Sequence, residues 1–157
     1  MKNRLVHVVP LILISLTILL LAACGGGSPA ATPTPTPSPM QMEIEAAIAQ
    51  FEAQGIADYT MRVTYRKRGW NPQIMDLAVT DGQAAILEQN CIPERTCGLR
   101  PVEAADFTLD SIFTVVREQA ALHEGIIEIA YHDAYGFPRI IATSVGAYEI
   151  SNFQPVE

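Results

Sequence analysis

Cysteine, histidine, tryptophan and basic residues are all scarce in this chain. Its 157 residues include three cysteines, three histidines and one tryptophan, and 10 Lys and Arg residues stand against 17 Asp and Glu residues. Binding to nucleic acid requires a basic surface, because contacts to the phosphates dominate the affinity. The acidic balance therefore argues against nucleic acid as a partner.

The sequence patterns of common enzyme and cofactor sites are also missing. The chain contains no Gly-x-Ser-x-Gly elbow, no His-Glu-x-x-His helix and no phosphate-binding loop. A zinc site built on Cys91 and Cys97 would need two more ligands, and His123 and His132 lack the paired spacing of such ligands. We therefore expect no metal site, no cofactor and no enzymatic activity.

The longest apolar run stands at the start of the chain, where it is typical of an export signal. Lys2 and Arg4 precede an apolar stretch from 5 to 21, which leads into Leu21-Ala22-Ala23-Cys24. These four residues resemble the lipobox of bacterial lipoproteins. The resemblance implies cleavage before Cys24 and a diacylglyceryl thioether on its sulfur. The alternative is an uncleaved transmembrane anchor of about the minimum spanning length.

Three segments are expected along the chain. Residues 1–23 form the signal peptide, residues 24–39 form the lipidated cysteine with a Gly/Thr/Pro-rich tether, and residues 40–157 form a single domain. Proline at every second position from 33 onward disfavours helix and central strand in the tether. Removal of the signal peptide changes the formal net charge from −7 to −9. The expected location is extracytoplasmic, lipid-anchored to the cell membrane, or to the outer membrane if the cell has one.

Apolar periodicity in the domain predicts an α+β fold. One helix is expected at about 40–54 and a second at about 109–122, with Thr108 as its N-cap. Alternating apolar and polar residues predict six strands, and Asp81-Gly82 marks a two-residue hairpin turn. The expected strands are residues 59–66, 75–79, 84–88, 127–131, 139–144 and 146–153. The predicted order is α-βββ-α-βββ, an antiparallel sheet of about six strands with two helices packed on one face.

The polar stretch from Gln89 to Asp106 is expected to form a loop that carries the two internal cysteines, Cys91 and Cys97. Export to an oxidising compartment makes such an even pair a predicted disulfide. The alternative is a reactive thiol or redox pair, which the missing Cys-x-x-Cys spacing disfavours.

Basic side chains are concentrated in one segment of the domain. Arg62, Arg66 and Arg68 are expected on one strand face, with Lys67 and Trp70 close by. This patch is a candidate site for an anionic lipid head group, a cell-wall polymer or an acidic protein. The alternative is a solvated strand face that protects a sheet edge from aggregation.

Several segments of the domain resemble a family of small bacterial lipoproteins built on a domain of unknown function, DUF6174. The segments are Asp58-Tyr59-Thr60, Asp81-Gly82, Thr108 to Phe113 and Tyr131 to Pro138. The last segment is similar to the Tyr-Asp-x-x-Tyr-Gly-Tyr-Pro turn of the family, with His132 at the position of an Asp. The resemblance covers about residues 42–153, and it implies the family's fold and a lipoprotein's location but no activity.

His132 and Tyr135 are candidate site residues within that last segment. A histidine beside an aspartate and two tyrosines is a possible general acid-base or binding group. The alternative is a structural turn, shaped by Gly136 and Pro138, in which the tyrosines pack.

These observations together predict a membrane-anchored, surface-displayed lipoprotein that acts as a binding or structural module in the cell envelope. The expected partners are the membrane, through the N-terminal lipid, and an envelope protein or polymer. The alternative function is a proteinaceous inhibitor or sensor of an extracellular hydrolase.

Overall fold

The computed structural model describes residues 36–122 and 125–156. The expected signal peptide, Cys24 and the tether as far as residue 35 lie outside the described residues, and so does His123. No helix within the described residues is long and apolar enough to cross a membrane.

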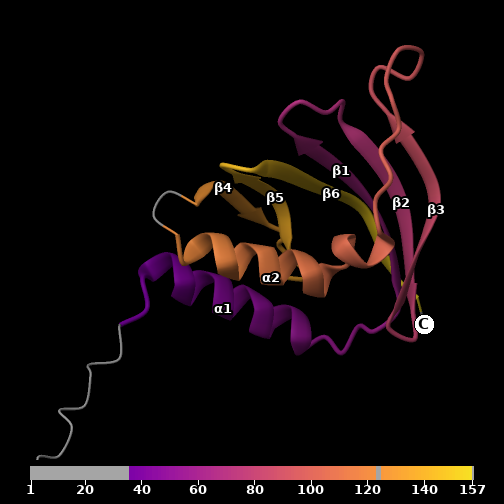
Figure 1. Ribbon diagram of the computed structural model, residues 1–157. Coiled ribbons are helices and arrows are strands. Elements are labelled where there is room, and N and C mark those ends of the chain that lie inside the picture. Colours follow the sequence, from indigo (N-terminus) through magenta and orange to yellow (C-terminus); the bar gives the residue numbers. More distant parts are fainter. Residues whose placement is uncertain (1–35, 123–124, 157) are drawn as a thin grey trace, which may run out of the picture. The chain divides into compact units, whose positions relative to one another are not determined.

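The described residues form two α-helices, a short 3-10 helix and six strands (Figure 1). The helices are α1 (Pro39–Glu52) and α2 (Leu109–Ala120), and η1 (Ala104–Phe107) is the 3-10 helix that precedes α2. The strands are β1 (Tyr59–Lys67), β2 (Gln73–Thr80), β3 (Gln83–Cys91), β4 (Ile126–Tyr131), β5 (Pro138–Thr143) and β6 (Gly146–Pro155). The order α-βββ-α-βββ confirms the predicted fold class.

The six strands belong to one antiparallel sheet with the order β3-β2-β1-β6-β5-β4. The first strand therefore pairs with the last, with Val63 opposite Ile150. Because β6 also pairs with β5, it joins a three-stranded block, β1 to β3, to the hairpin of β4 and β5.

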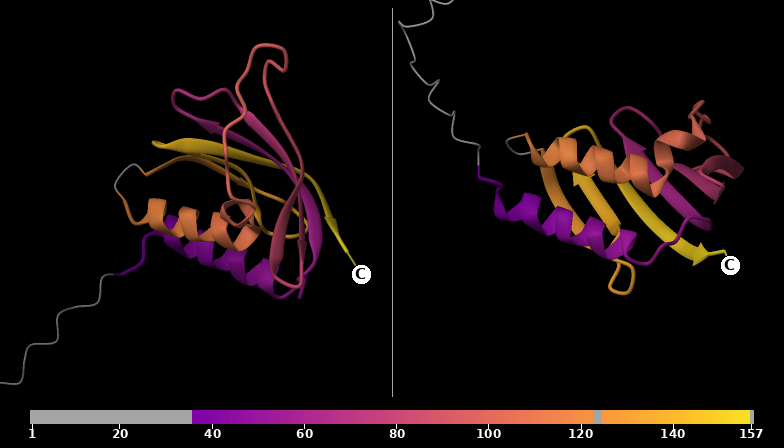
Figure 2. Two further views of the ribbon diagram at one scale, coloured as in Figure 1. Left: turned by 45° about the vertical axis from the view of Figure 1, so that its right-hand side comes forward. Right: turned by 90° about the horizontal axis from the view of Figure 1, so that it is seen from below.

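Both α-helices pack on the same face of the sheet, side by side and antiparallel (Figures 1 and 2). Arg117 of α2 donates two hydrogen bonds of 2.8 Å to the carboxylate of Glu45 in α1. Within the described residues the opposite face of the sheet carries no helix. The domain thus has two layers, as the sequence predicts.

Helix α1 begins inside the segment that the sequence assigns to the tether. Ser38 is its N-cap, and the Ser38 hydroxyl accepts a 3.2 Å hydrogen bond from the backbone N–H of Gln41. The Gln41 side chain accepts a 2.7 Å bond from the Ser38 N–H in return. Pro39 occupies the first turn, where its missing N–H costs nothing. The helix therefore starts one residue earlier than predicted, and its cap lies within the proline-rich segment.

The first three strands form a continuous meander. Asp81 and Gly82 have φ angles of 51° and 72°, the positive values that a tight two-residue hairpin requires, which confirms the predicted turn. Strand β3 continues three residues beyond its predicted end at Glu88, because its backbone stays paired with β2 as far as the pair Gln73 and Cys91. The loop predicted from Gln89 therefore starts only after Cys91.

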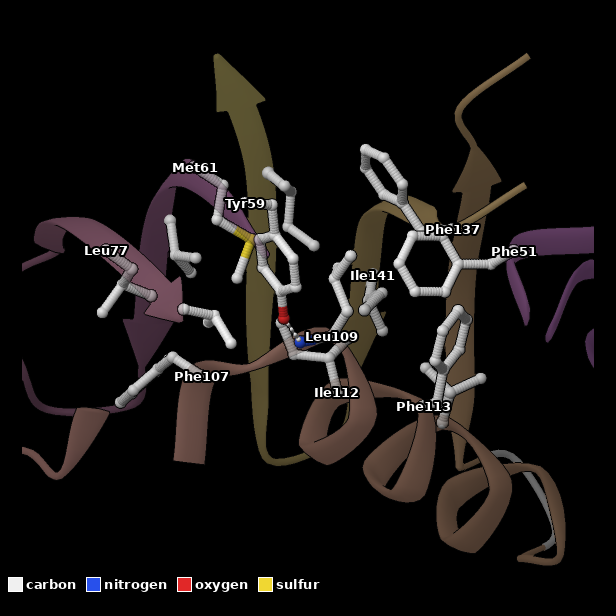
Figure 3. Packing of buried hydrophobic residues seen from close by; sticks show 14 of the residues in the cluster. Phe51, Tyr59, Met61, Leu77, Phe107, Leu109, Ile112, Phe113, Phe137 and Ile141 are labelled. Atoms are coloured by element: carbon white, nitrogen blue, oxygen red, sulfur yellow. Dashed lines mark hydrogen bonds between the residues drawn. The ribbon is translucent and has the colours of Figure 1, made fainter. Parts of the chain in front are cut away.

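One apolar core fills the space between the helices and the sheet (Figure 3). Phe51 of α1 and Phe113 of α2 pack at 5.7 Å between ring centroids. Tyr59 of β1 reaches into this core, and its hydroxyl oxygen accepts a 2.9 Å hydrogen bond from the backbone N–H of Leu109. That N–H belongs to the first turn of α2 and has no partner within the helix. The bond therefore fixes the start of α2 to the sheet, and burial raises the pKa of Tyr59 to about 12.

Candidate functional site

A second group of aromatic side chains gathers where β1 ends and β6 begins. The Tyr65 ring lies 4.9 Å from the ring of Tyr148, 5.3 Å from that of Phe107 and 6.2 Å from that of Trp70, measured between centroids. Phe107 is buried, whereas the other three side chains are only partly buried. This cluster therefore belongs to the core on one side and to the surface on the other.

The aromatic cluster lines an open groove of about 610 Å³. Further lining comes from the segment that follows the disulfide loop and from η1, namely Pro101, Val102, Glu103 and Asp106, and from Lys67 at the end of β1. The volume falls in the range of small-ligand sites, which combine apolar walls with a few polar groups. We call this feature the Trp70 groove.

The two tyrosine hydroxyls in the groove remain protonated at physiological pH. Burial, the neighbouring Tyr65 hydroxyl and the charge of Asp106 raise the pKa of Tyr148 to about 12. Burial also raises the pKa of Tyr65, against a hydrogen bond from Tyr148 that lowers it. Both hydroxyls are therefore neutral hydrogen-bonding groups, and each can both donate and accept a hydrogen bond.

Two cations lie near the Trp70 ring. The Nζ atom of Lys67 lies 4.9 Å from the centroid of the Trp70 ring, and the Cζ atom of Arg100 lies 5.6 Å from it. Both distances fall within the range of cation–π attraction. Arg100 belongs to the segment after the disulfide loop, so its contact joins the turn after β1 to that segment.

A fully buried glutamine fixes that segment to the sheet. Gln73, 0 % exposed in β2, donates hydrogen bonds from Nε2 to the carbonyl oxygens of Asn71 and Gly98, at 2.8 and 3.2 Å. Its Oε1 accepts from the backbone N–H of Arg100 at 3.0 Å and from the Gln89 side chain at 3.3 Å. Both ends of the buried amide are thus satisfied. Gln73 therefore positions the backbone that leads into the groove.

The predicted disulfide between Cys91 and Cys97 is present, with 5.9 Å between the two Cα atoms. It closes the loop that leaves the end of β3 and extends beyond the sheet (Figure 1). The segment held by Gln73 begins immediately after Cys97, so the disulfide and the glutamine together anchor both ends of this connection.

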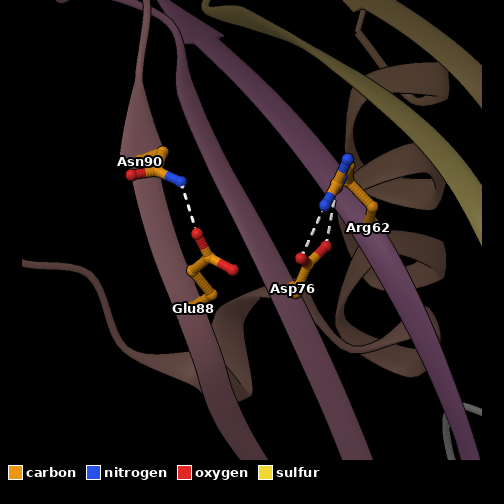
Figure 4. A network of polar contacts seen from close by, with 4 residues as sticks. All are labelled: Arg62, Asp76, Glu88 and Asn90. Carbon is orange, nitrogen blue, oxygen red and sulfur yellow. Dashed lines mark hydrogen bonds and ion pairs between the residues drawn. The ribbon is translucent and has the colours of Figure 1, made fainter. Parts of the chain in front are cut away.

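The structure divides the predicted basic patch between the two faces of the sheet. Arg62 and Arg66 point to the face without helices, whereas Trp70 lies in the groove on the helix side. Arg62 donates two 2.7 Å hydrogen bonds to Asp76, which hold the pKa of that carboxyl below its usual value (Figure 4). The Nη1 atom of Arg66 lies 3.4 Å from the Oε2 atom of Glu149. The positive charge of these two arginines is thus balanced by neighbouring carboxylates.

Arg68 does not share the strand face on which it is predicted. Strand β1 ends at Lys67, and the chain then turns through Gly69, whose φ is 79°. On the strand face near the arginines, Asn90 of β3 donates a 2.7 Å hydrogen bond to Glu88 (Figure 4). The face is therefore a mixed polar surface that carries both acidic and basic groups.

The turn with His132 and Tyr135 packs against the core beside the end of β6, whereas the Trp70 groove lies beside its beginning. The His132 ring lies 4.9 Å from that of Phe137 and 5.0 Å from that of Tyr135, and Tyr135 lies 5.0 Å from Phe153. The backbone N–H of Gly136 donates to the His132 carbonyl at 2.8 Å. The His132 Nδ1 atom also accepts a 3.3 Å hydrogen bond from the backbone N–H of Ala134, within the same turn. The candidate residues of the turn and Trp70 thus do not form one site, and these contacts of His132 and Tyr135 are ring packing and hydrogen bonding within the turn and against the core.

Sequence patterns alone single out few of the residues that build the groove. Tyr65 and Tyr148 are predicted only as members of strands. Asp106 ends the predicted loop, and Phe107 lies between that loop and the predicted N-cap Thr108. One signal was available: Gln73 is a polar residue in step with the core-facing positions Met75, Leu77 and Val79, and a buried amide of that kind requires partners. Among the described residues, no group of three or more His, Cys, Asp and Glu side chains is placed to hold a metal ion.

Comparison with known proteins identifies a family but no characterised relative. No curated protein matches the sequence. No solved structure matches it either. The model of a family of unknown function, DUF6174, matches residues 43–152, which is more than half of the chain and spans the domain from α1 to β6. The chain therefore belongs to the DUF6174 family.

Proposed function

We propose that this protein is a membrane-anchored, surface-displayed lipoprotein whose domain is a binding module of the cell envelope. The location is supported by the sequence Leu21-Ala22-Ala23-Cys24 after an apolar run, which resembles a lipobox. Several acyl chains hold a protein at a membrane far better than one, so no spanning helix is required. The Pro-rich residues 29–37 act as a spacer between the lipid and the domain.

The observation that carries the binding role is the Trp70 groove. It combines an open volume of about 610 Å³ with four aromatic side chains and with charged groups of both signs. Gln73 and the disulfide hold one side of the groove in place. The site is therefore preformed, and little binding free energy would be spent on ordering this segment when a ligand binds. The ligand is a component of the envelope that lies within reach of the tethered domain.

Replacement of the lipidated cysteine tests the location. In cells fed an alkyne-labelled fatty acid, the wild-type protein is expected to carry the label, and the Cys24→Ala variant is expected to carry none, because the thioether forms on that sulfur alone. Fractionation of the same cells is expected to find the wild type in the membrane in its lipidated form and the variant as precursor or secreted protein. Acyl labelling of Cys24→Ala would exclude the proposed anchor.

Co-sedimentation with isolated cell envelopes tests the binding role. The mature lipoprotein in detergent is expected to sediment with the envelope material, and Trp70→Ala is expected to lose most of this binding. Ile127→Ala is the matched control, because it removes an apolar side chain that is 72 % exposed on β4 and does not line the groove. Equal binding of both variants and the wild type would contradict a role for the groove.

A second candidate function is inhibition or sensing of an extracellular hydrolase. It is favoured by the disulfide-closed loop from Cys91 to Cys97, which extends beyond the end of β3 (Figure 1). A loop that is already closed loses little conformational entropy when it enters the cleft of an enzyme. Recovery of one hydrolase in stoichiometric amount from detergent extracts, lost on substitution of Glu94 or Arg95 at the loop tip, would support this function over the first.

A further inference from the structure

The charged groups around the Trp70 groove balance one another. Lys67 and Arg100 bring two positive charges to the Trp70 ring, and Glu103 and Asp106 bring two negative charges to the lining. A strongly anionic polymer would approach the two carboxylates, and a strongly cationic one would approach the two cations. Unfavourable like-charge contacts of this kind select against a partner. The groove therefore favours an uncharged ligand, although the domain as a whole is acidic.

The polar groups in the groove form a mixed set of donors and acceptors. The hydroxyls of Tyr65 and Tyr148 donate and accept, the ammonium of Lys67 donates, and the carboxylate of Asp106 accepts. Asp106 lies near enough to both tyrosines for its charge to raise their pKa values. A ligand with several hydroxyls satisfies such a set, because each hydroxyl is also both a donor and an acceptor.

The apolar part of the groove suits a ligand that has apolar faces and a polar rim. The rings of Tyr65, Trp70 and Tyr148 offer flat apolar surface next to these polar groups, and Val102 adds an aliphatic side chain. A sugar ring presents C–H bonds on its faces and hydroxyls on its rim, so it matches aromatic surface and hydrogen-bonding groups at the same time.

We propose that the Trp70 groove binds a short stretch of an uncharged glycan of the cell envelope, with sugar rings against the aromatic side chains and sugar hydroxyls bonded to Tyr65, Tyr148 and Asp106. This inference rests on the proposed function, because it names the ligand class of the same groove. Peptides and charged polymers are the competing ligands that the test separates.

The chain itself supplies the reporter for the test, because Trp70 is its one tryptophan. The mature lipoprotein is purified in a polyoxyethylene detergent, since maltoside detergents carry the sugar chemistry under test. The emission of Trp70 is then titrated with chitotetraose, an uncharged oligomer of N-acetylglucosamine. A saturable change in emission is the expected result, and absence of any saturable change up to millimolar concentrations would overturn the proposal.

Three variants locate the binding. Tyr148→Phe keeps the ring and removes the hydroxyl, and Asp106→Asn keeps the shape and removes the charge; each is expected to weaken binding about fivefold, the effect of one hydrogen bond. Asp106 is exposed, so that variant stays informative even if Tyr148→Phe disturbs folding. Tyr135→Phe, in the turn beside the end of β6, is the control and is expected to bind as the wild type does. Wild-type affinity in both groove variants would refute the assignment.

Two further titrations separate the ligand class from the proposed function. Polyglutamate and a neutral tetrapeptide are tested as anionic and peptide ligands, alongside the envelope sedimentation of wild type and Trp70→Ala. If sedimentation depends on Trp70 but chitotetraose does not bind, the glycan assignment is wrong and the binding function stands. If neither envelopes nor chitotetraose bind, both are wrong. Stronger saturation by polyglutamate or peptide than by chitotetraose would also overturn the glycan proposal.

Discussion

Gly136→Ala is expected to destabilise the domain through a direct contact between the turn of residues 132–137 and helix α1. Gly136 has a φ of 80°, and a Cβ atom placed on it would lie 2.9 Å from the carbonyl oxygen of Ala47 and 2.9 Å from the Cβ of Gln50. The positive φ alone costs an L-residue about 1–2 kcal/mol, partly offset by the lower entropy of the unfolded chain. Displacement of a packed helix adds about 1–3 kcal/mol. The sum is a loss of about 2–4 kcal/mol in the free energy of unfolding.

Gly69→Ala separates these two contributions. Gly69 has nearly the same φ, 79°, but a Cβ there meets nothing within 4 Å, so only the backbone cost remains. Urea melts of the two variants and the wild type are expected to show a loss of about 1 kcal/mol for Gly69→Ala and a clearly larger loss for Gly136→Ala. Equal losses in the two variants would show that α1 does not press on the turn, and the reasoning would fail.

Three other predictions concern residues of the core, the loop and the turn. Tyr59→Phe leaves the buried N–H of Leu109 without its acceptor and is expected to cost about 1–3 kcal/mol in urea melts at pH 7. The pKa of Tyr59 is raised from 10.0 to about 12. The contribution of this side chain to the free energy of unfolding is therefore complete below pH 10 and is lost as the pH rises toward 12. The free energy of unfolding of the wild type should fall across that range, and more steeply than that of Tyr59→Phe. The disulfide should appear as a mass two daltons below that of the reduced protein, and two free thiols in the native protein would contradict its presence. Replacement of Cys91 and Cys97 by serine should lower the free energy of unfolding by on the order of 2 kcal/mol. His132→Ala is expected to cost about 1 kcal/mol and to leave chitotetraose binding unchanged; loss of binding with an unchanged melt would place a functional site in that turn.

The fold was predictable because its signals are local and mutually consistent. The alternation in β1 and β2, the hairpin signal at Asp81-Gly82 and the N-cap at Thr108 each follow from short stretches of sequence, and each is confirmed. The errors lie at element ends, where tertiary contacts decide. β3 continues to Cys91 because β2 offers a partner there, which the polar residues of β3 do not reveal.

The groove was much harder to predict, because it depends on the pairing of distant segments. Tyr65 and Tyr148 become neighbours only through the register of β1 and β6, in which they stand directly opposite each other. Phe107 joins them because η1 places it against the Tyr65 ring. In the same way, the alternation of β1 predicts that Arg62 and Arg66 share a face but not that Asp76 and Glu149 neutralise them.

The pairing of β6 with both β1 and β5 has a consequence for how the domain folds. Without Gly146–Pro155, the sheet would consist of two separate pieces, β1 to β3 and β4 to β5, that share no strand contact. The central pairing joins residues that are 79 to 96 positions apart, from Lys67 with Gly146 at its near end to Tyr59 with Pro155 at its far end. Contacts of such high sequence separation form late and slowly. The complete sheet therefore assembles only once the C-terminal strand is available, so a chain that emerges N-terminus first holds β1 without its second partner until its last residues are free.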